Sequence, residues 1–100
     1  MTSAQRIDLH SHSFLSDGEL SPSEMLRRAS VLDYRALAIT DHADASNLAD
    51  LIAALWRVVR DQSGDFGVHL LVGVELTHVA PGSIGRLARL ASRLGAEVVV

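Results

Sequence analysis

The chain has 100 residues, of which 48% are hydrophobic and 21% charged, and its formal net charge is −3 at pH 7. These values fit one globular domain or part of one, and they exclude a disordered chain. The negative charge argues against a protein that binds nucleic acid through bulk positive charge. No cysteine is present. A disulfide framework and a thiolate metal site are therefore excluded, and any metal must be held by nitrogen and oxygen.

The N-terminal residues lack a hydrophobic signal region, and no apolar run reaches the ~20 residues needed to span a membrane. We therefore expect a soluble, cytoplasmic protein without a membrane partner. All nine basic residues are arginine, which excludes chemistry that needs a lysine within these residues.

The first predicted strand, residues 6–10, ends in two histidines separated by one serine. In an extended chain His10 and His12 point to the same side, with Cβ atoms roughly 6–7 Å apart. Two imidazoles at that spacing can bind one divalent ion at about 2.0–2.1 Å. Asp17 follows in a Ser-Asp-Gly turn and can add an oxygen ligand. Its alternative role is to stabilise that turn.

A helix is predicted to begin at Pro22, with Ser21 as its cap and Glu24 completing a capping box. The next strand, residues 36–40, is a continuous apolar run, which is typical of a strand covered on both faces. It is followed by Asp41 and His42. We expect His42 to bind metal, with helix entry as its alternative role. We expect Asp41 to orient a ligand or to cap the backbone.

A second helix is predicted over residues 47–62 and a third strand over 68–74, which delivers Glu75. The alternative for Glu75 is a side chain that faces solvent without binding a ligand. A third helix follows Pro81 and Gly82 and ends at Gly95, before a fourth strand over 96–100. Its inward-facing side chains are predicted to be Ile84, Leu87, Ala88, Ala91 and Leu94.

The alternation of strands and helices predicts an α/β fold with a parallel sheet, either open and doubly wound or closed into a barrel. No glycine-rich phosphate loop follows a strand, which disfavours the dinucleotide-binding version. Three strands each deliver a metal-ligand candidate near their carboxyl ends, where barrels assemble their active sites. We therefore expect a (β/α) barrel, of which this chain is the N-terminal half.

The candidate ligands form a set of histidines and carboxylates: His10, His12, Asp17, His42 and Glu75. This set suits zinc, manganese or iron. A mononuclear zinc site takes about three protein ligands, so five candidates favour a cluster of ions, which clamps phosphoryl oxygens and supplies a hydroxide nucleophile. His78 is a candidate substrate-binding residue. We expect a structural or exposed His69 and a solvated helix face at Arg86, Arg89 and Arg93.

Three segments of the sequence resemble the first three motifs of the PHP (polymerase and histidinol phosphatase) family. They are Asp8–His12 with Ser16–Gly18, then Ile39–His42, then Gly73–Glu75. The resemblance covers about residues 6–100 and is closest to small histidinol-phosphatase-related members. It implies a distorted (β/α)7 barrel with three divalent ions, in which the five residues of the candidate set are ligands. The family's later histidines and its Asp-x-His pair have no counterpart here.

The function expected from these observations is hydrolysis of a small phosphate monoester, of the histidinol-phosphatase kind, by metal-bound hydroxide. An amidohydrolase-like barrel and a catalytically inactive metal-binding barrel are the alternatives. Nucleic acid is the less favoured partner. We expect one domain over residues 1–100 that lacks its C-terminal part, with further chain after Val100 and a histidine within its first few residues.

Overall fold

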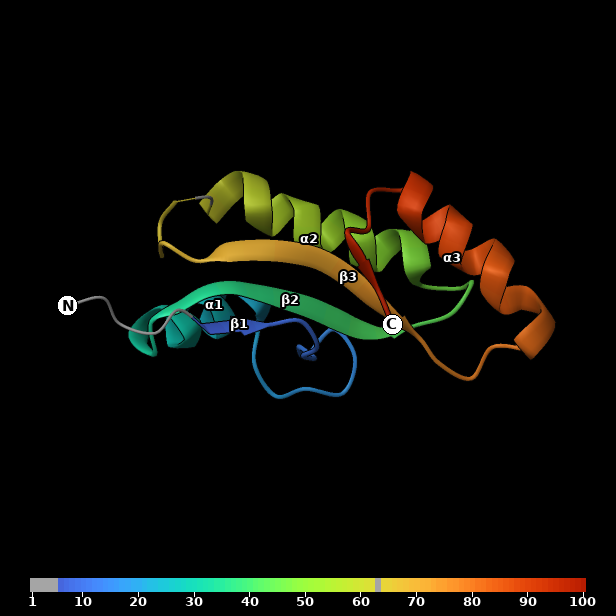
Figure 1. The fold of residues 1–100 in the computed structure, drawn as a ribbon, viewed down its shortest axis with the longest axis horizontal. Helices are drawn as coiled ribbons and strands as arrows, with labels where there is room; N and C mark the ends of the chain where they lie inside the picture. Colours follow the sequence, from blue (N-terminus) through green and yellow to red (C-terminus); the bar gives the residue numbers. More distant parts are fainter. Residues whose placement is uncertain (1–5, 63) are drawn as a thin grey trace.

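The computed structural model describes residues 6–62 and 64–100. Its four strands form one sheet in the order β1-β2-β3-β4, and every neighbouring pair is parallel (Figure 1). The elements in chain order are β1 (Arg6–Asp8), α1 (Pro22–Val31), β2 (Tyr34–Ala43), α2 (Leu48–Gln62), β3 (His69–Leu76), the 3-10 turn η1 (Pro81–Ser83), α3 (Ile84–Arg93) and β4 (Val98–Val99).

The sequential strand order decides between the two predicted architectures. A doubly wound sheet reverses its strand order at a switch point, and no reversal occurs among these four strands. Right-handed crossovers between successive neighbours place all three helices on the same face of the sheet. One hydrophobic core joins those helices to β2 and β3. The arrangement is the N-terminal half of a TIM-like barrel, which confirms the predicted fold class.

The strand limits differ from the sequence expectation. β1 ends at Asp8 instead of His10, because the Asp8 carboxylate accepts a hydrogen bond from the backbone N–H of His10 at 3.0 Å and turns the chain. β2 and β3 are longer than expected and continue to Ala43 and Leu76. The polar residues expected to follow these strands therefore lie inside them.

The helices begin and end close to their predicted limits. Ser21 caps α1, because its hydroxyl oxygen accepts a hydrogen bond from the N–H of Glu24. The Glu24 carboxylate, predicted to complete a capping box, forms an ion pair with Arg28 one turn later in the helix instead. In α3, Leu87 and Ala91 are buried as predicted. The inward placement of two others was wrong, because α3 covers only the edge of the core and leaves Ile84 46% and Leu94 41% exposed.

Gly95 ends α3 as predicted. Its φ of 106° is left-handed, and the N–H groups of Gly95 and Ala96 bond back to the carbonyls of Ser92 and Ala91.

Candidate metal centre

The face of the sheet opposite the helices carries the candidate ligands at its carboxyl-terminal edge. Side chains alternate along β2, so Leu37 and Ile39 enter the helix-side core while Thr40 and His42 face the other way. His42 pairs directly with Glu75 in the register of β2 and β3. Two ligand candidates are thus neighbours on adjacent strands.

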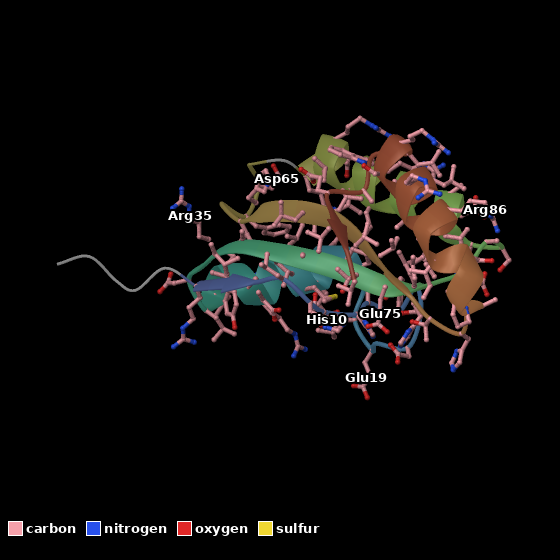
Figure 2. The ribbon with its side chains drawn as sticks, turned by 45° about the vertical axis from the view of Figure 1, so that its right-hand side comes forward. His10, Glu19, Arg35, Asp65, Glu75 and Arg86 are labelled. Carbon is pink, nitrogen blue, oxygen red and sulfur yellow. The ribbon has the colours of Figure 1, made fainter. Side chains whose placement is uncertain are left out.

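Glu75 joins the strand edge to the His-x-His segment. Its Oε1 atom lies 2.6 Å from Nε2 of His10 and 3.0 Å from Nε2 of His12. Figure 2 shows His10 and Glu75 together on the side of the sheet away from α2 and α3. One carboxylate oxygen therefore contacts both histidines that were expected to converge on an ion.

Asp17 makes the corresponding link on the other side of His12. Its two carboxylate oxygens lie 2.8 Å from Nδ1 of His12 and 2.9 Å from Nε2 of His42. The ring centroids of His12 and His42 are 4.3 Å apart. His12 thus sits at the centre of the cluster, with a carboxylate at each ring nitrogen.

This central position shifts the pKa values of the group. Burial acts to lower the pKa of His12, but hydrogen bonds to Asp17 and Glu75 outweigh it and raise that pKa above 6.5. The bond with His12 lowers the pKa of Asp17. The pKa of Glu75 falls to about 2, chiefly because the Thr77 hydroxyl donates to it and also because of the bond from His10. The two carboxylates therefore favour the protonated form of the His12 imidazole.

Thr77 belongs to this cluster and was missed in the sequence. Its hydroxyl donates to Oε2 of Glu75 at 2.8 Å and lies 2.7 Å from Nδ1 of His42. The signal was its position two residues after Glu75, which places both side chains on one face of an extended chain. Thr77 therefore positions two candidate ligands at once.

Asp41 lies inside the protein and fixes the loop that carries the histidines. Its carboxylate is fully buried and accepts from the N–H and the hydroxyl of Ser13, each at 2.7 Å, and from the hydroxyl of Ser16. The predicted backbone-capping role of Asp41 is confirmed. The loop closes tightly at Gly18, where an added Cβ would lie 2.3 Å from the carbonyl oxygen of His12.

The remaining histidines lie outside the cluster. His69 is exposed at the start of β3, in agreement with its prediction. His78 is exposed with a left-handed φ of 59° and lines a separate pocket together with Arg86. Arg86, Arg89 and Arg93 are all exposed, as expected for a solvated helix face.

Comparison with known proteins places this geometry in a family. The model of the PHP domain matches residues 8–95, which include every residue of the cluster. The chain belongs to the PHP domain family. This match favours the PHP architecture over the amidohydrolase-like alternative.

Several curated proteins are similar to this PHP chain. It is 48% identical over 97 residues to an uncharacterized protein of Methanocaldococcus jannaschii, covering 95% of this chain and 44% of that protein. It is 41% identical over 71 residues to a 3',5'-nucleoside bisphosphate phosphatase of Chromobacterium violaceum, covering 71% of this chain and 22% of that protein. It is 34% identical over 73 residues to a 5'-3' exoribonuclease of Haemophilus influenzae, covering 73% of this chain and 24% of that protein.

The chain spans less than half the length of these relatives. No solved structure matches it. Among the described residues, every helix is too short or too polar to cross a bilayer. The cytoplasmic location stays a prediction.

The cluster of this PHP chain can accommodate divalent metal. Ligand atoms of His10, His12 and Glu75 lie within 4.8 Å of one another, and so do those of His12, Asp17 and His42. Two ligands of one tetrahedral ion are about 3.4 Å apart. The nitrogen–oxygen contacts of 2.6 to 3.1 Å would open by about half an ångström to admit an ion. Both groups include His12, and they do not give the number of ions. The expectation of three ions therefore stays a prediction.

Proposed function

We propose that this chain contributes its cluster to a metal-dependent phosphoesterase that hydrolyses a phosphate monoester. The observation that carries the proposal is Glu75, whose Oε1 atom contacts both His10 and His12 while Oε2 is held by Thr77. Divalent ions bound there would activate water and neutralise charge that develops at phosphorus. The ligands proposed to hold them are His10, His12, Asp17, His42 and Glu75.

The side chains around the ions would fix their geometry before substrate binds. Thr77 orients Glu75 and His42, and Asp41 holds the backbone of Ser13, next to His12. Supporting hydrogen bonds of this kind set ring orientation and ligand basicity, and their loss typically costs 10–100-fold in metal affinity or activity. The activity therefore depends on residues that would touch neither metal nor substrate.

Nucleoside phosphates are the substrates that we propose to test first, because one similar protein is named a nucleoside bisphosphate phosphatase and another an exoribonuclease. Histidinol phosphate is to be tested beside them. The protein loaded with manganese or zinc should release phosphate from small monoesters and lose this activity with chelator. A protein that binds metal but releases no phosphate would be the inactive barrel. Cleavage of amides or cyclic imides without phosphate release would favour the amidohydrolase chemistry.

A further inference from the structure

The His-x-His segment rejoins the sheet after β1 has ended. The last paired residues of β1 and β2 are Asp8 and Leu37. Three residues later, the carbonyl of Ser11 accepts a hydrogen bond from the backbone N–H of Thr40 at 2.7 Å. The hydroxyl of Thr40 donates to the same carbonyl at 3.2 Å. The segment is therefore bound to β2 through its middle residue.

The Ser11 hydroxyl takes the place of a backbone donor in this attachment. In a parallel ladder, a residue bonds to both residues that flank its partner, through its carbonyl on one side and its N–H on the other. Ser11 makes the carbonyl bond to Thr40, and its Oγ atom donates to the carbonyl of Ala38 at 2.6 Å. Ser11 therefore lies opposite Ile39, and its side chain completes the pairing.

This pairing leaves one extra residue in the strand that leads to the histidines. The chain advances three residues from Asp8 to Ser11, whereas β2 advances two, from Leu37 to Ile39. A bulge of this kind bends the strand and aims its side chains in new directions. A side chain fixes each end of the bulge, Asp8 at its start and Ser11 at its end.

The two histidines flank Ser11 and converge on one carboxylate oxygen. Nε2 of His10 and Nε2 of His12 lie 2.6 Å and 3.0 Å from Oε1 of Glu75, and the two ring centroids are 5.3 Å apart. Ser11 lines a hollow beside α1 together with Met25. Because a slip of one residue would exchange the two faces of the segment, the convergence depends on the register that Ser11 fixes.

We propose that Ser11 is a positioning residue for metal binding, because its bond to Ala38 holds the register in which His10 and His12 face one ion. The inference rests on the metal binding of the proposed function. It assigns the role of aligning both histidines to the residue between them, which acts through the backbone.

The first experiment needs no metal. In the protein stripped of metal by chelator, the nuclear Overhauser effect between the ring protons of His10 and His12 measures their separation. Ser11→Ala should weaken this signal severalfold. Ser11→Thr should retain it, because it keeps the hydroxyl and the adjacent hollow of about 200 Å³ has room for a methyl group. Ser92→Ala removes an exposed hydroxyl of α3 and is the control. An undiminished signal in Ser11→Ala would overturn the proposal.

The second experiment measures zinc affinity by competition with a chelator. Ser11→Ala should weaken zinc binding 10–100-fold, while Ser11→Thr and Ser92→Ala should bind like the original protein. In a His10→Ala background the same substitution should cost a smaller factor, because no second imidazole remains to be aligned with His12. Equal losses in both backgrounds would show a general destabilisation and overturn the proposal.

Two further results are decisive. If Ser11→Ala does not fold, Thr40→Val replaces it, since it removes one bond to the Ser11 carbonyl and should lower zinc affinity by a smaller factor. An unchanged affinity in folded Thr40→Val would then overturn the proposal. If the original protein binds no zinc, the proposed function fails, and the ring signal of the metal-free variants decides the role of Ser11.

Discussion

His12 has a carboxylate against each of its ring nitrogens, Asp17 at 2.8 Å and Glu75 at 3.0 Å. An imidazole can donate to both only when it is protonated. A metal ion requires a ring nitrogen without its proton instead, so metal binding competes with protonation of His12.

The first prediction is that metal affinity increases with pH. Because the carboxylates raise the pKa of His12 above 6.5, the proton competes with metal up to that raised pKa. Below it, the apparent affinity for zinc should rise roughly tenfold per pH unit for this one proton. Isothermal titration calorimetry in two buffers of different ionisation enthalpy would measure both the affinity and the protons released. A pH-independent affinity between pH 6 and 7, with no proton release, would contradict this view of His12.

The second prediction concerns Thr77, which contacts two candidate ligands and is not itself proposed as a ligand. Thr77→Val keeps the shape but removes the hydroxyl that is the main cause of the low pKa of Glu75. The pKa of Glu75 should rise from about 2 toward its ordinary value of 4.5. Metal affinity should fall 10–100-fold.

A carbon-detected magnetic resonance titration of the metal-free protein would follow the Glu75 carboxyl. Ser92→Ala removes an exposed hydroxyl of α3 and serves as the control. An unmoved Glu75 pKa in Thr77→Val would show that the hydroxyl does not hold this carboxylate.

At the scale of elements, the loop between β1 and α1 holds the cluster in place. Gly18→Ala would put a Cβ 2.3 Å from the carbonyl oxygen of His12 and 2.9 Å from the carbonyl carbon of Ser13. The loop must shift, so we expect a loss of about 2–3 kcal/mol in unfolding free energy and weaker metal binding. Urea denaturation measures the first effect.

Gly82→Ala is the matched control, because nothing lies within 4 Å of a Cβ added there. Equal stabilities of the two variants would mean that the loop tolerates a side chain at Gly18.

Local pattern predicted the number, type and order of these elements, but not their exact limits. The apolar run of β2 stops at Thr40, yet the strand continues because His42 and Ala43 pair with Glu75 and Leu76 of β3. Conversely, β1 stops early because the Asp8 side chain takes the N–H of His10. Both outcomes depend on the hydrogen-bond partner of a backbone group. The periodicity of the sequence carries no information about that partner.

The candidate site was largely visible in the sequence, because each ligand candidate lies near the carboxyl end of a strand or in the loop after it. The structure brings together the five residues first grouped from their spacing, although their binding of metal stays a proposal. The sequence did not reveal Thr77, nor that Asp41 bonds both Ser13 and Ser16 across 28 and 25 residues. The Asp41 contacts arise only when β2 packs beside the loop. The contact of Thr77 with His42 arises only when β2 and β3 lie side by side.

At the scale of the whole molecule, the face opposite the helices is incompletely covered. Ile7 pairs with Ala36 on that face and is 56% exposed, and both outer strands, β1 and β4, have one edge unpaired within this sheet. We predict that residues 1–100 on their own bind a hydrophobic dye and self-associate. Sedimentation as a monomer without dye binding would show that this face is stable in water.

The account depends most on one claim, that the His-x-His segment binds divalent metal. Elemental analysis of the purified protein tests it directly, by comparing the original sequence with a His10→Ala, His12→Ala double variant. His69→Ala is the control, since His69 is exposed and outside the cluster. We expect the double variant to lose at least one equivalent of metal while its circular dichroism is unchanged, and the control to keep its full content. An unchanged metal content in the folded double variant would contradict the account.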